Sequence, residues 1–184
     1  MANLITSARI ALIIPFIFVF MANASWNMSA ALVIFVIAAL TDFIDGRVAR
    51  ARGETSALGA ALDPIADKLL VAAALILLAR NGVIAGAGVV AVLVIILREV
   101  FVSGLREALG RRGEALAVTS LAKWKTTAQL VATGLLIAAA PTGIIGDSLR
   151  PAASAALWIA AMLTFWTGTE YGLRAIHLLR ADRT

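Results

Sequence analysis

The chain has 184 residues, of which 61% are hydrophobic and only 15% are charged. Its mean hydropathy is +0.95. Soluble domains carry about 25% charged residues, so this composition excludes an ordinary soluble protein and indicates an integral membrane protein. The formal net charge is +5, but the basic residues interrupt apolar segments and form no separate patch, which argues against nucleic-acid binding. The absence of cysteine excludes disulfides, thiol nucleophiles and sulfur-ligated metals.

Apolar segments follow one another along the chain with little sequence between them. A helix needs about 20 residues to cross a bilayer, and six segments of about this length can be placed. They are Leu4–Met21, Ser29–Arg50, Ala57–Leu78, Val83–Leu109, Thr119–Ala140 and Ala152–Leu178. The sequence therefore predicts an all-α, polytopic membrane protein with six transmembrane helices. We expect one domain over residues 1–184, because no linker or internal repeat divides the chain.

The distribution of basic residues predicts the orientation of these segments. If both termini and the second and fourth loops share one side, Arg80 and Arg150 are the only two of the 16 Lys and Arg residues on the other side. The side rich in basic residues is expected to face the cytoplasm. An Ala-x-Ala pattern within residues 21–24 leaves a cleaved signal peptide as the less favoured alternative for the first segment.

Four aspartates lie in the second and third segments, at a depth where charge is costly. The twelve uncharged residues of Ser29–Leu40 cover only about 18 Å of a hydrocarbon core about 30 Å thick, so the helix must continue through the first two aspartates. Asp42 and Asp45 are three residues apart, and Asp63 and Asp67 are four apart, so each pair lies on one helix face. An unpaired carboxylate here costs about 2.5 to 3.5 kcal/mol, so we expect a compensating partner.

Divalent cations are the compensating partner that the carboxylates favour. Gly53 and Gly59 flank the turn between the two segments, so an antiparallel hairpin brings both pairs together. Four carboxylates in a site of low dielectric repel one another, and hard oxygen ligands select Mg²⁺, Mn²⁺ or Ca²⁺. Structural alternatives remain: Asp63 can cap a helix, and the first two aspartates can pair with Arg50 or Lys68.

The spacing of the acidic block, read as D-x2-D-G-x2-A-R-x8-G-x3-D-x3-D, resembles the signature of the CDP-alcohol phosphotransferase family without a gap. The matching residues are Asp42, Asp45, Gly46, Ala49, Arg50, Gly59, Asp63 and Asp67. This resemblance implies a six-helix membrane enzyme, usually a homodimer, in which an alcohol displaces CMP from a CDP-linked lipid. It implies two divalent metal ions, Mg²⁺ or Mn²⁺, held by Asp42, Asp45 and Asp63, with Asp67 as a further metal ligand or the general base. It also implies that Gly46, Ala49, Arg50 and Gly59 bind the CDP group.

A second group of charged residues follows in the fourth and fifth segments. Its basic members are Arg98, Arg106, Lys123 and Lys125. Arg98 and Arg106 lie within about 80° of each other on a helix, and such a cationic pocket predicts an acceptor that carries phosphate. In the alternative, these cations extend towards the membrane surface or pair with Glu99 and Glu107.

The resemblance extends over nearly the whole chain through the stretches "NLITSAR", "REVFVSGLRE" and "KTTAQ". These look like the bacterial members of the family that use CDP-diacylglycerol as the donor and sn-glycerol 3-phosphate as the acceptor. The resemblance implies a bacterial cytoplasmic membrane location with the active site facing the cytoplasm, and phosphate binding by the four cations, with Thr126 as a weaker candidate. Two alternatives stay open: inositol phosphate or another alcohol as the acceptor, and a divalent-cation transporter.

The aromatic residues are expected to have structural roles. Trp26, Trp124 and Tyr171 suit the membrane–water interface, whereas Trp158 and Trp166 are expected to pack against neighbouring helices.

Overall fold

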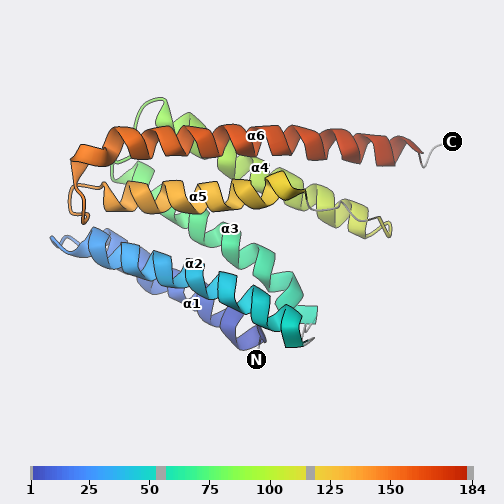
Figure 1. Ribbon diagram of the computed structural model, residues 1–184, viewed down its shortest axis with the longest axis horizontal. Helices are drawn as coiled ribbons and strands as arrows, with labels where there is room; N and C mark the ends of the chain where they lie inside the picture. The colour runs from blue at the N-terminus through green and yellow to red at the C-terminus, as the bar shows by residue number, and fades with distance from the viewer. Residues whose placement is uncertain (1, 53–56, 115–118, 182–184) are drawn as a thin grey trace. The chain divides into compact units, whose positions relative to one another are not determined.

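The computed structural model describes the backbone over residues 2–52, 57–114 and 119–181, and the side chains over 10–41, 65–66, 68–114 and 119–178. These residues form six α-helices and one short 3-10 helix, η1 (Figure 1). In chain order they are α1 (Ala2–Met21), α2 (Asn27–Arg52), α3 (Ala57–Arg80), α4 (Gly88–Gly110), α5 (Ser120–Ala138), η1 (Asp147–Leu149) and α6 (Arg150–Ala181). The predicted all-α class and the order of six helical segments are confirmed.

The start of α4 differs most from the sequence prediction. The sequence placed the fourth segment from Val83, whereas the helix begins at Gly88. Gly82 has a φ of 70°, the left-handed conformation that commonly ends a helix. The backbone N–H groups of Val83 and Ile84 donate to the carbonyl of Leu78, at 3.0 and 3.2 Å. These two apolar residues therefore close the end of α3 and are buried there, which delays the next helix.

The contacts along the chain divide it into two compact units. The first comprises Met1–Ala85 and Thr133–Ser154, and the second comprises Gly86–Ala132 and Ala155–Thr184. α5 and α6 each contribute residues to both units.

In the first unit, α1 packs against α2 and α3, and α2 also contacts α3. The rings of Phe16 and Phe20 are 5.5 Å apart, and Phe16 lies 6.3 Å from Phe35 of α2. All three rings are buried. The aromatic cluster therefore packs the C-terminal end of α1 against α2.

Asn27 connects the α1–α2 turn to a distant segment of the same unit. Its Nδ2 donates to the carbonyl of Ala22 at 2.8 Å, and its Oδ1 accepts from Thr142 Oγ1 at 2.5 Å. The residue is buried, so its amide satisfies backbone and side-chain groups that have little access to solvent.

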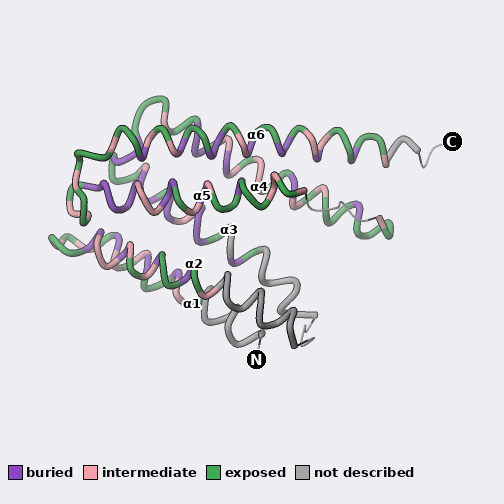
Figure 2. The backbone as a smooth tube through the Cα atoms, viewed as in Figure 1, coloured by how far each residue is buried: buried purple, intermediate pink, exposed green. Residues whose placement is uncertain are grey.

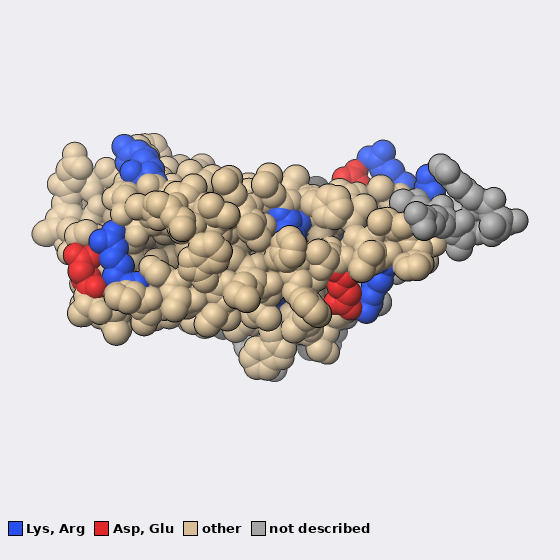
Figure 3. Space-filling view, turned by 90° about the horizontal axis from the view of Figure 1, so that it is seen from above, with Lys and Arg blue, Asp and Glu red and all other residues tan. Residues whose placement is uncertain are grey.

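Many large apolar residues of the described helices are exposed. Figure 2 marks the exposed residues of α4 and α6 in green. Within the described chain, Gly88–Gly110 and Asp147–Leu178 are long and apolar enough to cross a membrane. Charged side chains on the face in Figure 3 form a few separate groups with a broad uncharged surface between them. Trp166 is 68% exposed, so the prediction that it packs against neighbouring helices is wrong, and its ring belongs to the apolar exterior. Trp158 is 39% exposed, and its packing role stays a prediction.

Candidate functional site

The two acidic pairs lie at matching positions on neighbouring helices. Asp42 lies ten residues before the end of α2, and Asp67 lies ten residues after the start of α3. Asp45 and Asp63 lie seven and six residues from the same two ends. Because only residues 53–56 connect these contacting helices, each pair stands about 10 to 15 Å along its helix from the connection. These nearly equal distances from the connection predict that the four carboxylate-bearing positions lie at one level of α2 and α3.

The structure does not describe the side chains of the signature residues. These residues are Asp42, Asp45, Gly46, Ala49, Arg50, Gly59, Asp63 and Asp67. Their assignment as metal ligands, general base and CDP ligands stays a prediction. Among the side chains that are described, no three His, Cys, Asp or Glu residues gather as a metal site.

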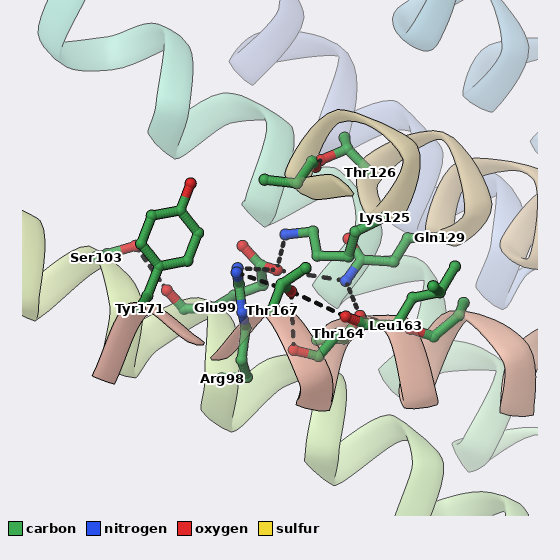
Figure 4. A network of polar contacts seen from close by, with 12 residues as sticks. Arg98, Glu99, Ser103, Lys125, Thr126, Gln129, Leu163, Thr164, Thr167 and Tyr171 are labelled. Carbon is green, nitrogen blue, oxygen red and sulfur yellow. Dashed lines mark hydrogen bonds and ion pairs between the residues drawn. The ribbon is translucent and has the colours of Figure 1, made fainter. Parts of the chain in front are cut away.

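A polar network joins α4, α5 and α6 within the second unit (Figure 4). Glu99 Oε1 accepts hydrogen bonds from Arg98 Nη1 at 3.2 Å, from Gln129 Nε2 at 3.3 Å and from Lys125 Nζ. Only 9% of the Arg98 side chain and 6% of the Lys125 side chain are exposed. Charges withdrawn from solvent in this way are costly, so their hydrogen-bonding partners must compensate them.

α6 supplies the hydroxyl groups of this network. Arg98 Nη2 donates to Thr167 Oγ1 at 3.0 Å, and Gln129 Nε2 donates to Thr164 Oγ1 at 2.8 Å. The Nε of Arg98 is buried and has no hydrogen-bond partner among the described residues. Both terminal nitrogens of the Arg98 guanidinium are thus hydrogen-bonded, whereas its Nε–H group has no partner among the described residues.

Tyr171 lies next to the network and contacts two arginines. Its hydroxyl accepts from Arg106 Nη2 at 3.1 Å and from the backbone N–H of Thr119 at 3.2 Å. The guanidinium carbon of Arg106 lies 5.1 Å from the ring centre, and that of Arg98 lies 5.6 Å away, within the range of cation–π attraction. Tyr171 is 1% exposed, so its ring faces other helices and not lipid; its depth in the membrane stays a prediction. The guanidinium groups of both arginines of α4 lie beside this ring.

The pairing expected from the sequence holds in part. Glu99 pairs with Arg98 and also with Lys125. Glu107 pairs at 2.6 Å with Arg111, the residue just after α4, and both side chains are exposed. Arg106 has no carboxylate partner in the described part of the chain, so its positive charge stays available to an anion.

Lys123 and Thr126 lie elsewhere on α5. Both are exposed, and Thr126 Oγ1 donates to the backbone carbonyl of Ala122 at 3.3 Å. Residues two apart on a helix face nearly opposite directions, so Lys123 and the buried Lys125 occupy different faces of α5. The structure brings Arg98, Arg106 and Lys125 into one polar region and leaves Lys123 outside it; phosphate binding by all four stays a prediction.

The sequence prediction missed the contribution of α6. Thr164, Thr167, Gly168 and Tyr171 follow the i, i+3, i+4, i+7 spacing that places residues on one helix face. Three polar residues in this pattern, inside an apolar helix, are a signal that the sequence contains. The pattern marks the face of α6 that meets the charged residues of α4 and α5.

Comparisons with known proteins cover nearly the whole chain. A family model described as CDP-alcohol phosphatidyltransferase matches residues 1–166. A CDP-diacylglycerol–glycerol-3-phosphate 3-phosphatidyltransferase of Bacillus subtilis is 40% identical, covering 92% of this chain and 91% of the relative. A protein of the same name from Cereibacter sphaeroides is 38% identical over 86% of each chain. The CDP-diacylglycerol–glycerol-3-phosphate 3-phosphatidyltransferase 2 of Arabidopsis thaliana is 37% identical over 92% of this chain and 76% of the relative.

Proposed function

Because the chain belongs to the CDP-alcohol phosphatidyltransferase family, we propose that it transfers the phosphatidyl group of CDP-diacylglycerol to sn-glycerol 3-phosphate. The products are phosphatidylglycerophosphate and CMP. The observation that carries the choice of acceptor is the shared name of relatives that are 38% and 40% identical over most of their length. The basic network of α4 and α5 supports the same choice, because this acceptor carries a phosphate.

The reaction is an in-line displacement at the lipid-linked phosphorus. A hydroxyl oxygen of the acceptor forms a new bond to that phosphorus while the bond to the CMP oxygen breaks. The hydroxyl proton passes to a carboxylate, for which we assign Asp67 as the general base. CMP leaves with the electron pair of the broken bond. No covalent enzyme intermediate is required, so the chain has to bind, orient and accept a proton.

The donor set fits a pair of divalent metal ions. Asp42, Asp45, Asp63 and Asp67 offer only hard oxygen ligands, which Mg²⁺ and Mn²⁺ prefer, and each pair lies six to ten residues from the α2–α3 connection. When bound, such ions neutralise the diphosphate and the leaving oxygen.

The small residues of the signature suit the other half of the donor. Gly46, Ala49 and Gly59 carry little or no side chain, so the backbone of α2 and α3 leaves space for a close approach of the CDP group. Arg50 supplies a guanidinium for its phosphates.

Arg106 is central to the proposed acceptor site. Arg106 is an exposed residue, and its guanidinium donates to a neutral phenol, so a phosphate can bind without displacing a carboxylate. Arg98 shares the ring of Tyr171 with Arg106, and Lys125 shares Glu99 with Arg98. We assign these three cations to the acceptor phosphate; Lys123 lies outside this group, on another face of α5.

The membrane arrangement belongs to the same proposal. All six helices cross the bilayer of a bacterial cytoplasmic membrane, and the active site faces the cytoplasm, where soluble glycerol 3-phosphate and CMP exchange freely. Support comes from the apolar exterior and from the basic residues on one side of the predicted threading. Residues 1–184 act as one catalytic domain, since the family model, over residues 1–166, runs through both compact units. We also propose that two chains associate as a homodimer, which the family resemblance implies.

A CMP-release assay with purified protein tests the proposed function. CDP-diacylglycerol is supplied with sn-glycerol 3-phosphate, inositol phosphate or glycerol, each with and without a chelator. We expect release with glycerol 3-phosphate only, loss with the chelator, and recovery with Mg²⁺ or Mn²⁺. Asp67→Asn should abolish release while still binding the donor. Preference for inositol phosphate would assign a different acceptor, and metal flux into liposomes without CMP release would indicate a transporter.

A further inference from the structure

Gly168 of α6 lies next to the aliphatic part of the Arg98 side chain. A Cβ placed on Gly168 would stand 2.6 Å from Arg98 Cγ, 3.4 Å from its Nε and 3.6 Å from its Cδ. Cβ contacts below about 3.0 Å are essentially absent from real structures, since interiors are close-packed at van der Waals distances. Arg98 therefore crosses α6 at a place where any side chain other than glycine's would stand in its path.

The closest atom to the added Cβ is Cγ of Arg98. Cγ is placed by the first side-chain torsion alone, so Arg98 can relieve the overlap only by changing its χ1 rotamer or by moving α6. A new rotamer carries the whole guanidinium away. Arg98 would then lose its 3.0 Å bond to Thr167, its 3.2 Å bond to Glu99 and its place over Tyr171.

The backbone conformation does not itself require glycine here. Gly168 lies inside α6 and is not among the glycines with positive φ, which in the described part of the chain are Gly82, Gly86, Gly113 and Gly146. Glycine weakens a helix interior relative to alanine, so its presence calls for a reason such as close approach. Gly172, one turn later, differs: its added Cβ would meet only Phe101 at 3.7 Å, an ordinary contact.

We propose that Gly168 is a positioning residue for the acceptor: by leaving space for Arg98 to cross α6, it fixes the guanidinium that binds the acceptor's phosphate. This inference rests on the proposed function, specifically on the assignment of Arg98 to the phosphate of glycerol 3-phosphate. Gly168 acts through Arg98 and does not touch substrate. Its effect therefore falls on acceptor binding and leaves the CDP-linked donor unaffected.

The test compares Gly168→Ala with Gly172→Ala, a matched change on the same helix. Loss of a charge-assisted hydrogen bond weakens binding by about tenfold or more, so Gly168→Ala should raise the KM for glycerol 3-phosphate by about tenfold. The KM for CDP-diacylglycerol should stay within about twofold, because that change is small on the energy scale of one such bond. Gly172→Ala should leave both KM values unchanged. Equal effects of the two variants would overturn the inference, because they would indicate general helix packing.

Arg98→Ala and the double variant separate this inference from the proposed function. With Arg98 truncated at Cβ, an alanine at position 168 meets no Cγ, so the double variant should match Arg98→Ala in KM and should be at least as stable to thermal unfolding, because alanine favours the helix. The same comparison holds if Gly168→Ala does not fold, since the double variant should then recover folding; failure to recover would contradict the inference. If Arg98→Ala raises the acceptor KM but Gly168→Ala does not, the inference alone fails. If Arg98→Ala leaves that KM unchanged, the proposed role of Arg98 fails.

Discussion

Glu99 is the acceptor on which hydrogen bonds from α4 and α5 converge. It receives donors from Arg98, Lys125 and Gln129, and 14% of its side chain is exposed. A carboxylate in this position makes two buried cations tolerable. Glu107, on the same helix, has a similar ion pair with Arg111, but 67% and 78% of those two side chains are exposed. The two glutamates therefore allow a direct comparison of a buried and an exposed ion pair.

Glu99→Gln should destabilise the protein strongly because it leaves Arg98 and Lys125 without their shared negative charge. Breaking a buried pair costs about 3 kcal/mol or more. Glu107→Gln should cost less than about 0.5 kcal/mol, since an exposed pair contributes little. Thermal unfolding of both variants in the same detergent measures the difference. Equal shifts would show that the buried network does not depend on the Glu99 charge.

Tyr171→Phe should weaken acceptor binding and stability together. The change keeps the ring beneath the two arginines but removes the hydroxyl that accepts from Arg106 and from Thr119. Each lost bond costs about 1 kcal/mol net, so we expect a loss of about 1 to 2 kcal/mol and a higher KM for glycerol 3-phosphate. Trp166→Phe, an exposed aromatic change on the same helix, is the control and should alter neither value. An unchanged acceptor KM in Tyr171→Phe would remove the hydroxyl from the proposed site.

At the residue scale, the sequence identified which side chains are too polar for lipid, but not how they pair. Arg98 and Lys125 were recognised as unusual because a transmembrane segment rarely contains a cation. Their common partner, and the burial of Tyr171, depend on contacts between residues 26 to 69 positions apart. Periodicity within one helix does not specify which faces of different helices meet. The roles of the four signature aspartates stay a prediction that rests on their spacing in the sequence.

At the scale of elements, the lengths of the apolar segments predicted the six helices, whereas the start of α4 depends on the conformation of the turn before it. α2 and α3 begin and end within two residues of the predicted segments. α4 begins five residues late because Gly82 ends α3 in the left-handed conformation and Val83 is used to close that end. An apolar residue after a helix-ending glycine therefore belongs to the preceding helix, although its hydropathy suits the next one.

Asn27→Ala should loosen the α1–α2 turn and the α5–α6 connection in one step. The change removes the donor to Ala22 and the acceptor for Thr142 in a buried place, so the expected loss is about 2 kcal/mol. Asn81→Ala is the matched control, because Asn81 is exposed and its side chain, among the described residues, accepts a hydrogen bond only from its neighbour Arg80, at 3.1 Å. Its effect should stay below about 0.5 kcal/mol. A smaller effect at Asn27 than at Asn81, by thermal unfolding, would contradict this role.

At the scale of the whole molecule, the composition predicted a membrane protein, and the exposed apolar surface of α4 and α6 is consistent with lipid contact. The division into two compact units was not predicted, because both α5 and α6 are shared between them. A sequence without linkers gives no indication of a boundary that crosses uninterrupted helices.

The proposed membrane topology can be tested by introducing single cysteines, since the chain contains none. Arg111→Cys lies just after α4, and Ser148→Cys lies in η1 before α6; both positions are exposed. In intact cells, an impermeant thiol reagent should label Ser148→Cys and should reach Arg111→Cys only after the membrane is opened. Labelling of both from the same side would contradict the six-span arrangement.

The most direct test of the central claim follows the phosphate of the acceptor. sn-Glycerol 3-phosphate labelled in its phosphate is incubated with CDP-diacylglycerol, Mg²⁺ and the purified protein, and the lipid extract is analysed by mass spectrometry. The account predicts labelled phosphatidylglycerophosphate formed in equal amount with CMP, and none with Asp67→Asn. CMP release with no label in the lipid, or a labelled lipid without CMP, would contradict it.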